Sequence, residues 1–149
     1  MSDPLTPYPL TGFRFMVHFL GLELPVDMAF QEVSGLEMNV ETELMREGGE
    51  YAFSYRLPLR ISQPELVLKR GLTTQSLLTA WVLDALENFN FTPLLVTIIL
   101  LNEKQLPVMT WEATQAWPVG WSLSPFNAQA NEVVIETLKL AYAHLRRLL

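Results

Sequence analysis

The stretch LEMNVETELMREGGEYAFSYRLPLRI, residues 36–61, alternates apolar and polar side chains on both sides of a glycine pair. Alternation with a period of two is typical of β-strands that have one buried face. Gly48 and Gly49 can adopt the positive φ angles that a tight turn between two strands requires. The stretch therefore predicts one long β-hairpin over about residues 36–61.

The predicted hairpin has an apolar face, which we expect to be buried, and a charged face. The charged face sets carboxylates of the first strand against guanidinium groups of the second, and each good cross-strand pair contributes about 0.2–1 kcal/mol. The charged residues concerned are Glu41, Glu43, Glu47, Arg56 and Arg60. This face is either a solvated surface or a surface that the protein presents to a partner or a channel.

The segments around the hairpin predict further strands. Residues 12–20 and 109–117 alternate apolar and polar side chains, and residues 64–71 are expected to form a short strand that ends at a glycine. Residues 94–101, LLVTIILL, are apolar almost throughout, which is typical of a central strand buried on both faces. The chain thus contains about six or seven strands.

One helix is expected over about residues 73–89, where apolar side chains recur at helical spacing, with Thr73 or Thr74 as its N-cap. Residues 131–149 fit both a helical stripe and a strand face, and periodicity alone favours a helix there. One helix and several strands point to a small barrel or sandwich with the helix packed on it.

The whole chain of 149 residues is expected to form one domain. Residues 1–11 carry three prolines and predict an extended N-terminal arm, and residues 144–149 form a C-terminal tail. Only 17% of the residues are charged, which leaves little charge to cover the surface of a free monomer. The composition therefore predicts that part of the surface meets another protein.

Charge and composition exclude several classes of protein. The net charge is −6, and the only adjacent basic pairs are Lys69-Arg70 and Arg146-Arg147, so the broad basic face of a nucleic-acid binder is missing. The absence of cysteine excludes disulfides and thiol nucleophiles, and two histidines, His18 and His144, are too few for a histidine-based metal site. We expect no secretory signal peptide and no membrane insertion, because the apolar runs are far shorter than the ~20 residues that a spanning helix needs.

The search for catalytic groups gives a weak candidate only. Glu41 and Glu43 lie on one strand face, which a hydrolase with paired carboxylates would require, but any polar strand face gives the same spacing. Ser34 does not sit in a G-x-S-x-G elbow, and no phosphate-binding or metal motif is present. The sequence therefore predicts no enzymatic activity and no cofactor.

Three segments, taken as an ordered set, point to a known family. They are residues 30–37 (FQEVSGLE), residues 66–71 (LVLKRG), and the run from Pro107 through Trp111, Ala116-Trp117-Pro118 and Trp121 to residues 131–138 (NEVVIETL). In this order and spacing the chain resembles the inner tail-tube proteins of contractile phage tails and of related extracellular contractile injection systems. The aromatic strand around Phe13-Arg14-Phe15 also suits that family, and the resemblance covers about residues 8–145.

The resemblance implies a mainly β fold, a six-stranded antiparallel β-barrel flanked by one helix, with residues 131–140 on a strand rather than a helix. It implies that six copies join into a ring and that rings stack into a hollow tube for cargo, protein or DNA. The implied partners are further copies of the chain and sheath, spike or hub, and baseplate proteins. It also implies a protein made in the cytoplasm that acts in an extracellular or virion-like particle.

The long hairpin is the expected contact surface of such a ring, because its tip can reach a neighbouring ring, while its carboxylates line the lumen or meet bases on the next ring. The expected ring or inter-ring residues are Glu41, Glu43, Glu47, Gly48, Gly49, Arg56 and Arg60. The proline-rich arm and the apolar, basic tail differ from a bulk tube subunit and suit an interface with a different protein. They favour a tube initiator that joins the tube to the spike and baseplate. The alternative is a monomeric small-ligand-binding β-barrel, which requires a deep apolar cavity.

Overall fold

The computed structural model describes residues 13–21, 26–46, 54–73 and 76–149. In these residues the fold is mainly β with one helix, as expected, and all strand pairs are antiparallel. The helix is α1 (Leu77–Asn88). The strands are β1 (Arg14–Leu20), β2 (Val26–Phe30), β3 (Glu32–Ser34), β4 (Asn39–Arg46), β5 (Ser54–Ser62), β6 (Leu66–Gly71), β7 (Leu94–Leu101), β8 (Pro107–Leu123), β9 (Ile135–Ala141) and β10 (His144–Arg147).

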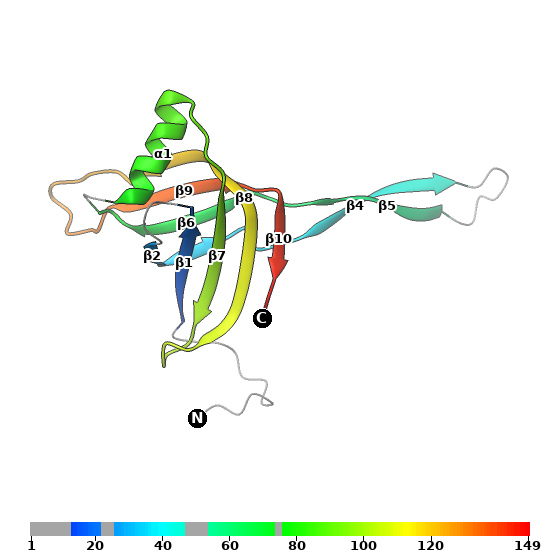
Figure 1. The fold of residues 1–149 in the computed structure, drawn as a ribbon, viewed down its shortest axis with the longest axis horizontal. Helices are drawn as coiled ribbons and strands as arrows, with labels where there is room; N and C mark the ends of the chain where they lie inside the picture. The colour runs from blue at the N-terminus through cyan, green and yellow to red at the C-terminus, as the bar shows by residue number, and fades with distance from the viewer. Residues whose placement is uncertain (1–12, 22–25, 47–53, 74–75) are drawn as a thin grey trace.

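Eight strands form one sheet, and two form another. The large sheet has the order β2–β1–β7–β8–β9–β6–β3, with β10 paired to β8, while β4 and β5 pair only with each other. The long strand β8 joins two layers, because its first part pairs with β7 and β10 and its second part with β9. Figure 1 shows β1 and β7 running across the direction of β6 and β9. The large sheet therefore folds over onto itself around a common core.

The core consists of the inward side chains of both layers. Burial alternates residue by residue along β1, β6, β7 and β9, as expected for strands with one face against the core. Helix α1 adds Leu78, Trp81 and Val82 to the same cluster. The indole Nε1 of Trp81 donates a hydrogen bond of 2.8 Å to the carbonyl oxygen of Thr92, which satisfies the one polar atom of that side chain.

The helix starts later than predicted. Thr73 or Thr74 was the expected cap, but the N-cap is Ser76, whose backbone is extended and whose Oγ accepts a hydrogen bond of 3.2 Å from the amide of Leu78. Ser76 Oγ also accepts a hydrogen bond of 3.1 Å from Nη2 of Arg70, which fixes the start of the helix to β6. The helix ends at Phe89, a residue with φ of 53° whose amide donates to the carbonyl oxygen of Asp84.

The C-terminal segment contains β9 and β10 and no helix, so the helical preference of its periodicity was wrong, and the strand that the family resemblance implied over residues 131–140 is confirmed from Ile135 onward. Leu138 and Leu140 of β9 are buried in the core, while Thr137 and Lys139 point away from it. Pairing with β6 on one side and β8 on the other determines this conformation, and such long-range pairing overrides local period. The tail is partly built into the fold, because Leu145 of β10 is buried.

Two other expectations have different outcomes. The large sheet has seven strands along an open path from β2 to β3 and β10 beside β8, so a count of six in a closed barrel is not established. The N-terminal arm over residues 1–11 lies outside the described residues.

Candidate functional site: surfaces for assembly

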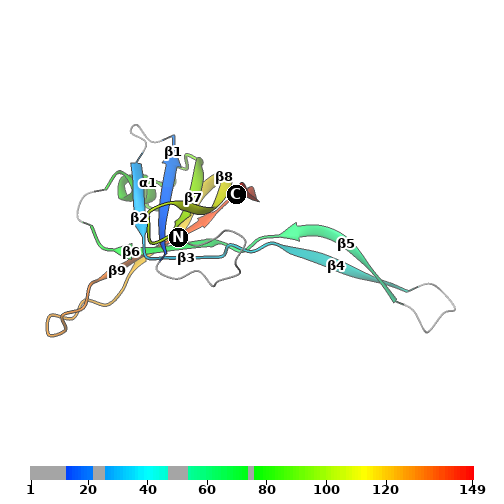
Figure 2. The same ribbon diagram turned by 90° about the horizontal axis from the view of Figure 1, so that it is seen from below.

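The predicted hairpin exists and projects away from the rest of the fold. β4 and β5 extend from the end of β3 and the start of β6 as a two-stranded arm, which Figures 1 and 2 show from two sides. The expected turn residues Glu47, Gly48 and Gly49 lie outside the described residues. The described part of the hairpin brings Glu41, Glu43, Arg56 and Arg60 onto one arm.

A register shift divides the hairpin into two parts. Glu41 lies opposite Arg60, but the next residue, Thr42, lies opposite Pro58, so Leu59 is an additional residue in β5. Such a β-bulge changes which side chains share a face beyond it. The single apolar face predicted from alternation is therefore wrong.

Apolar side chains occupy both faces of the hairpin. On one face Val40 lies opposite Ile61, and on the other Met45 lies opposite Tyr55. Leu57 lies opposite Glu43 and so shares the face of Met45 and Tyr55. A surface that packs on one face of a two-stranded hairpin leaves the other face exposed. Two surfaces are therefore needed to bury the apolar side chains on both faces of β4–β5.

The apolar side chains of the hairpin are exposed rather than buried. Met38, Val40, Leu44, Met45, Tyr55, Leu57, Leu59 and Ile61 are 42–63% exposed. The expected burial is wrong for the single subunit, because β4 and β5 make their main contacts with each other. Contiguous exposed apolar side chains are typical of surfaces at which a protein meets a partner or a ligand.

The charged residues of the hairpin form one cross-strand pair. Nε of Arg60 donates a hydrogen bond to Oε2 of Glu41, and both side chains are exposed. That hydrogen bond and the charge of Glu41 raise the pKa of Arg60 above its ordinary value. Glu43 and Arg56 are not paired in this way, because they lie opposite Leu57 and Leu44. An exposed ion pair contributes little to stability and more to the specificity of a contact.

A buried polar network, which the sequence analysis missed, ties the layers together. Nε of Arg70 donates to Oε2 of Glu136 at 2.9 Å, and Nε1 of Trp121 donates to Oε1 of the same carboxylate at 2.8 Å. The guanidinium carbon of Arg70 also lies 5.6 Å from the ring centroid of Phe30. The alternation of β6 and β9 contained the signal, because Arg70 and Glu136 occupy the same inward positions as Leu68 and Leu138.

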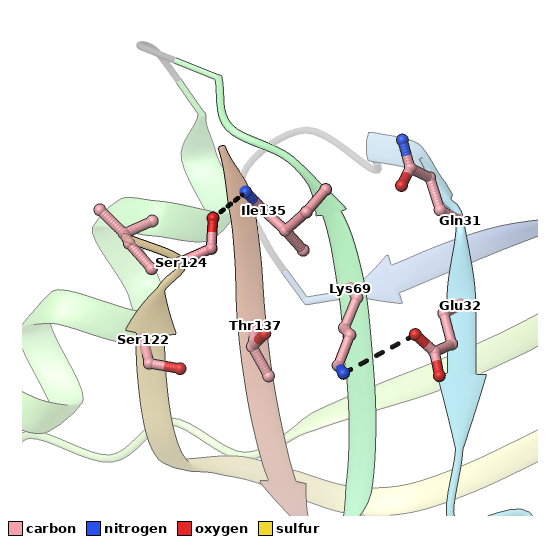
Figure 3. A pocket seen from close by; sticks show the side chains of 8 residues that line it. Gln31, Glu32, Lys69, Ser122, Ser124, Ile135 and Thr137 are labelled. Carbon is pink, nitrogen blue, oxygen red and sulfur yellow. Dashed lines mark hydrogen bonds and ion pairs between the residues drawn. The ribbon is translucent and has the colours of Figure 1, made fainter. Parts of the chain in front are cut away.

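An open hollow lies on the solvent side of the second layer, shown in Figure 3. Its volume is about 600 Å³, and it is lined by Gln31, Glu32, Lys69, Ser122, Leu123, Ser124, Ile135 and Thr137. Nζ of Lys69 lies 3.7 Å from Oε2 of Glu32, and the amide of Ile135 donates to Ser124 Oγ at 2.8 Å. This hollow is open to solvent and is not the deep apolar cavity that a small-ligand barrel requires.

The described residues contain neither a candidate metal site nor a helix that could span a membrane. No group of three or more histidine, aspartate or glutamate side chains there is arranged to hold a metal ion. No helix among the same residues is long and apolar enough to cross a membrane.

Comparison with known proteins decides the family. Residues 11–146 match the family described as the T4-like virus tail tube protein gp19. The chain belongs to this tail tube family. The protein is therefore a structural tube subunit, as the resemblance implied. No curated protein sequence is similar enough to this chain to match it.

Solved structures agree with the family. A chain of the anti-feeding prophage (AFP) baseplate, solved by cryo-EM with six-fold symmetry, is 37% identical over 99% of this chain and 97% of its own length, with a TM-score of 0.84. A chain of the PVC sheath–tube complex, an extracellular contractile injection system, is 22% identical over 95% of this chain and 93% of its own, with a TM-score of 0.78. Hcp1 from Salmonella typhimurium, 11% identical over 92% of this chain and 86% of its own, shares the fold with a TM-score of 0.62.

Proposed function

We propose that six copies of this tube subunit close into a ring, that the β4–β5 hairpin supplies the main contact between copies, and that rings stack into a hollow tube for cargo. One observation carries the proposal: apolar side chains are exposed on both faces of a hairpin that projects from the body. The six-fold symmetry of the similar AFP baseplate assembly supports the number of copies.

The energetics of the hairpin require a partner. A two-stranded hairpin without packing is marginally stable in water. Complete burial of a side chain such as Leu57 or Ile61 contributes about 1.5–3 kcal/mol relative to full exposure, and the hairpin holds eight large apolar side chains that are only about half covered. Two surfaces are needed to bury both faces of the hairpin. One belongs to a neighbouring copy, and the other belongs to a further copy in the same ring or in the next ring.

The charged residues of the hairpin are proposed as the specificity-determining part of this contact. Glu41, Glu43, Arg56 and Arg60 stand among the apolar residues, where they can be matched by opposite charges on a neighbouring copy. Glu47, Gly48 and Gly49 complete the proposed contact at the turn. Because an isologous pair of identical surfaces would stop at two copies, the contact must be heterologous, with hairpin against body.

We also propose that the sheet acts as the six-stranded barrel of the family resemblance. β2 and β3 are separated by Gln31 alone, and its amide donates a hydrogen bond of 2.9 Å to the carbonyl oxygen of Lys69. β2 pairs with β1, and β3 pairs with β6. Counted as one bent strand, β2 and β3 connect the two ends of the path β1–β7–β8–β9–β6 and close it as a barrel of six, with β10 outside it.

Within the particle, we propose the position of tube initiator, the ring that joins the tube to the spike and baseplate. Identity supports this position, since it is 37% with the AFP baseplate chain and 22% with chains of the PVC sheath–tube complex and the AFP tube-terminating cap. The exposed tail residues Arg146, Leu148 and Leu149 offer a basic and apolar contact to a different protein. The proposed partners are copies of the chain, sheath, spike or hub, and baseplate proteins, with protein or DNA cargo in the lumen.

We further propose that the chain is one structural domain without catalytic activity, cofactor or membrane insertion. It is made in the cytoplasm and is released within an extracellular particle. Glu41 and Glu43 are then contact residues, and their replacement by glutamine changes assembly rather than any turnover.

Imaging tests the proposal at two levels. Negative-stain images of the purified chain are expected to show six-fold rings, alone or stacked, and a field of single compact particles would contradict the ring. Cryo-EM of the whole particle is expected to show one ring of this chain, adjacent to the baseplate. Many stacked rings of it along the tube would contradict the initiator position and leave the ring intact.

A further inference from the structure

An exposed aromatic cluster lies at the C-terminal end of α1, away from the hairpin. The side chains of Phe89 and Phe91 meet edge to face with ring centroids 4.8 Å apart, and those of Phe91 and Trp117 do the same at 5.2 Å. Phe89 is 83% exposed and Trp117 37%, while Leu86, three residues before Phe89, is 40% exposed. We call Leu86, Phe89, Phe91 and Trp117 the aromatic patch. It is a second apolar surface, formed by the end of α1, the residues after it and β8.

The backbone at Phe89 indicates that the aromatic patch has a role outside the single subunit. Phe89 is the C-cap of α1 and has a φ of 53°, in the left-handed region that favours glycine. Most of its side chain lies in water, so burial within the subunit does not compensate for this conformation. A phenylalanine in this conformation and with this exposure has a physical explanation if another molecule covers its ring.

Acidic side chains border the aromatic patch. Asp84 and Glu87 lie near the end of α1, and the last turn of that helix contains no basic residue. The side-chain amides of Asn88 and Asn90 donate hydrogen bonds of 3.0 and 2.8 Å to the carboxylate of Asp84, but they add no positive charge. The two carboxylates and the negative end of the helix dipole therefore act in the same direction. A partner surface that combines apolar side chains with a base and carries no acid fits this patch.

One face of the hairpin has this composition. Strand register places Val40, Ile61, Leu44 and Arg56 on the same face of β4–β5, and all four side chains are exposed. The carboxylates of β4 lie on the opposite face, where the acids of α1 would repel them. A guanidinium group is also attracted to the face of an aromatic ring, so Arg56 suits the aromatic side chains as well as the acids beside them.

We propose that the aromatic patch of one copy receives the Leu44–Arg56 face of the hairpin of the neighbouring copy; the inference rests on the proposed ring. The strand order β8–β9–β6–β3 places the two surfaces at opposite edges of one layer. The hairpin continues β3 and β6, while α1 packs on β8. Figure 1 shows α1 on one side of the body and the hairpin leaving from the other. Contact between opposite sides is heterologous and repeats from copy to copy until the ring closes.

Disulfide cross-linking in assembled rings tests the contact. The chain has no cysteine, so Leu44→Cys/Phe89→Cys carries only the two introduced thiols. Oxidation of purified, imaged rings with copper phenanthroline in air is expected to join neighbouring copies into a ladder on non-reducing gels. Met45→Cys/Phe89→Cys is the matched control, because Met45 follows Leu44 in β4, lies on the opposite face and is similarly exposed, 55% against 60%. This control should give little cross-linking.

A charge exchange tests the same contact without a new bond. Arg56→Glu and Glu87→Arg each bring like charges together, and each should raise the concentration at which rings dissociate at least about tenfold. The double variant Arg56→Glu/Glu87→Arg should recover most of this loss. Both residues are exposed, so circular dichroism should show an unchanged fold in all three variants. Analytical ultracentrifugation over a dilution series measures the dissociation.

The outcomes separate this contact from the ring itself. Rings in which Phe89→Cys cross-links to neither hairpin position, or equally to both, would overturn the inference. A double charge variant that assembles no better than the single variants would also overturn it. Absence of rings of the unmodified chain would instead refute the proposed function.

Discussion

Nε of Arg70 donates a hydrogen bond of 2.9 Å to Oε2 of Glu136 in a core where the two side chains are 9% and 6% exposed. The pair connects β6 to β9, and its hydrogen-bond partners Trp121 and Ser76 connect it to β8 and to the start of α1. The pair thus joins the layer of β6, β9 and the end of β8 to the helix. Its integrity therefore decides whether the subunit keeps the shape that assembly needs.

Removing one member of this pair should destabilise the subunit strongly. Glu136→Leu leaves the guanidinium of Arg70 and the indole N–H of Trp121 without their carboxylate, and we expect a loss of about 3–5 kcal/mol in the free energy of unfolding. The double variant Arg70→Met/Glu136→Leu should lose much less, because no buried charge is left alone. Urea denaturation measures both, with Glu32→Gln in the exposed pair as the control. A double variant less stable than the single one would contradict this explanation.

Gly35 is required by a close approach of two backbone segments. Its φ is +89°, and an added Cβ would overlap the carbonyl oxygen of Glu65. Gly35→Ala should therefore cost more than about 2 kcal/mol of stability, since both the φ angle and the contact oppose it. Gly71→Ala is the control, because its added Cβ would meet Val133 Cγ1 at an ordinary 3.4 Å. Equal midpoints for the two variants in thermal unfolding would show that the close approach is not a constraint.

The two faces of the hairpin should both be needed for assembly. Ile61→Ser and Leu57→Ser each remove one exposed apolar side chain, from opposite faces. We expect each to weaken assembly at least about tenfold, which is 1.4 kcal/mol, while subunit stability changes by no more than about 0.5 kcal/mol. Analytical ultracentrifugation and chemical denaturation measure the two quantities, with Thr42→Ser as a control on the same arm. If only one of the two variants weakened assembly, one face of the hairpin would pack on a neighbour and the other would stay in water, which would contradict the proposed contact.

Tyr142 should make stability depend on pH in the alkaline range. Burial, and then the negative charge of Glu37, raise its pKa above the ordinary value of 10.0, and its hydroxyl donates to the carbonyl oxygen of Pro64 at 2.8 Å. The folded state therefore holds this proton more tightly than the unfolded state. Its contribution is complete below pH 10 and is lost as pH rises through the raised pKa.

The comparison with Tyr142→Phe isolates this effect. The variant should lose about 0.5–1.5 kcal/mol at neutral pH and lack this part of the alkaline decline. The phenolate absorbance of the folded wild-type protein should show one tyrosine that ionises above pH 10. This ionisation should be missing from Tyr142→Phe. An unchanged alkaline decline in Tyr142→Phe would assign the pH dependence to other groups.

Alternation in the sequence predicted the strands that have a partner within the subunit. β1, β6 and β7 bury the side chains that period two selects, because each is paired on both sides or packed on the core. The hairpin was predicted as an element, but its faces were not. The bulge at Leu59 does not change the apolar spacing of the sequence, and no element of the described subunit selects which face of the hairpin is buried.

The start of the helix and the conformation of the C-terminal segment could not be predicted, because contacts with other strands determine both. Thr73 and Thr74 were the predicted caps, but Ser76 is the cap, and its Oγ is held by a hydrogen bond from Arg70 that the helical pattern does not contain. Leu138 and Tyr142 in the C-terminal segment satisfy a helical and a strand period at once. Only pairing with β6 and β8 separates those readings.

The most direct test of the ring is the mass of the purified, full-length chain in solution across a range of concentrations. Light scattering coupled to size-exclusion chromatography at micromolar concentration should give six times the subunit mass of 17.0 kDa, or larger multiples of that ring. Leu57→Ser should shift the population toward the single subunit. A wild-type chain that remains at 17.0 kDa throughout this range, with the hairpin exposed to water, would contradict the central claim.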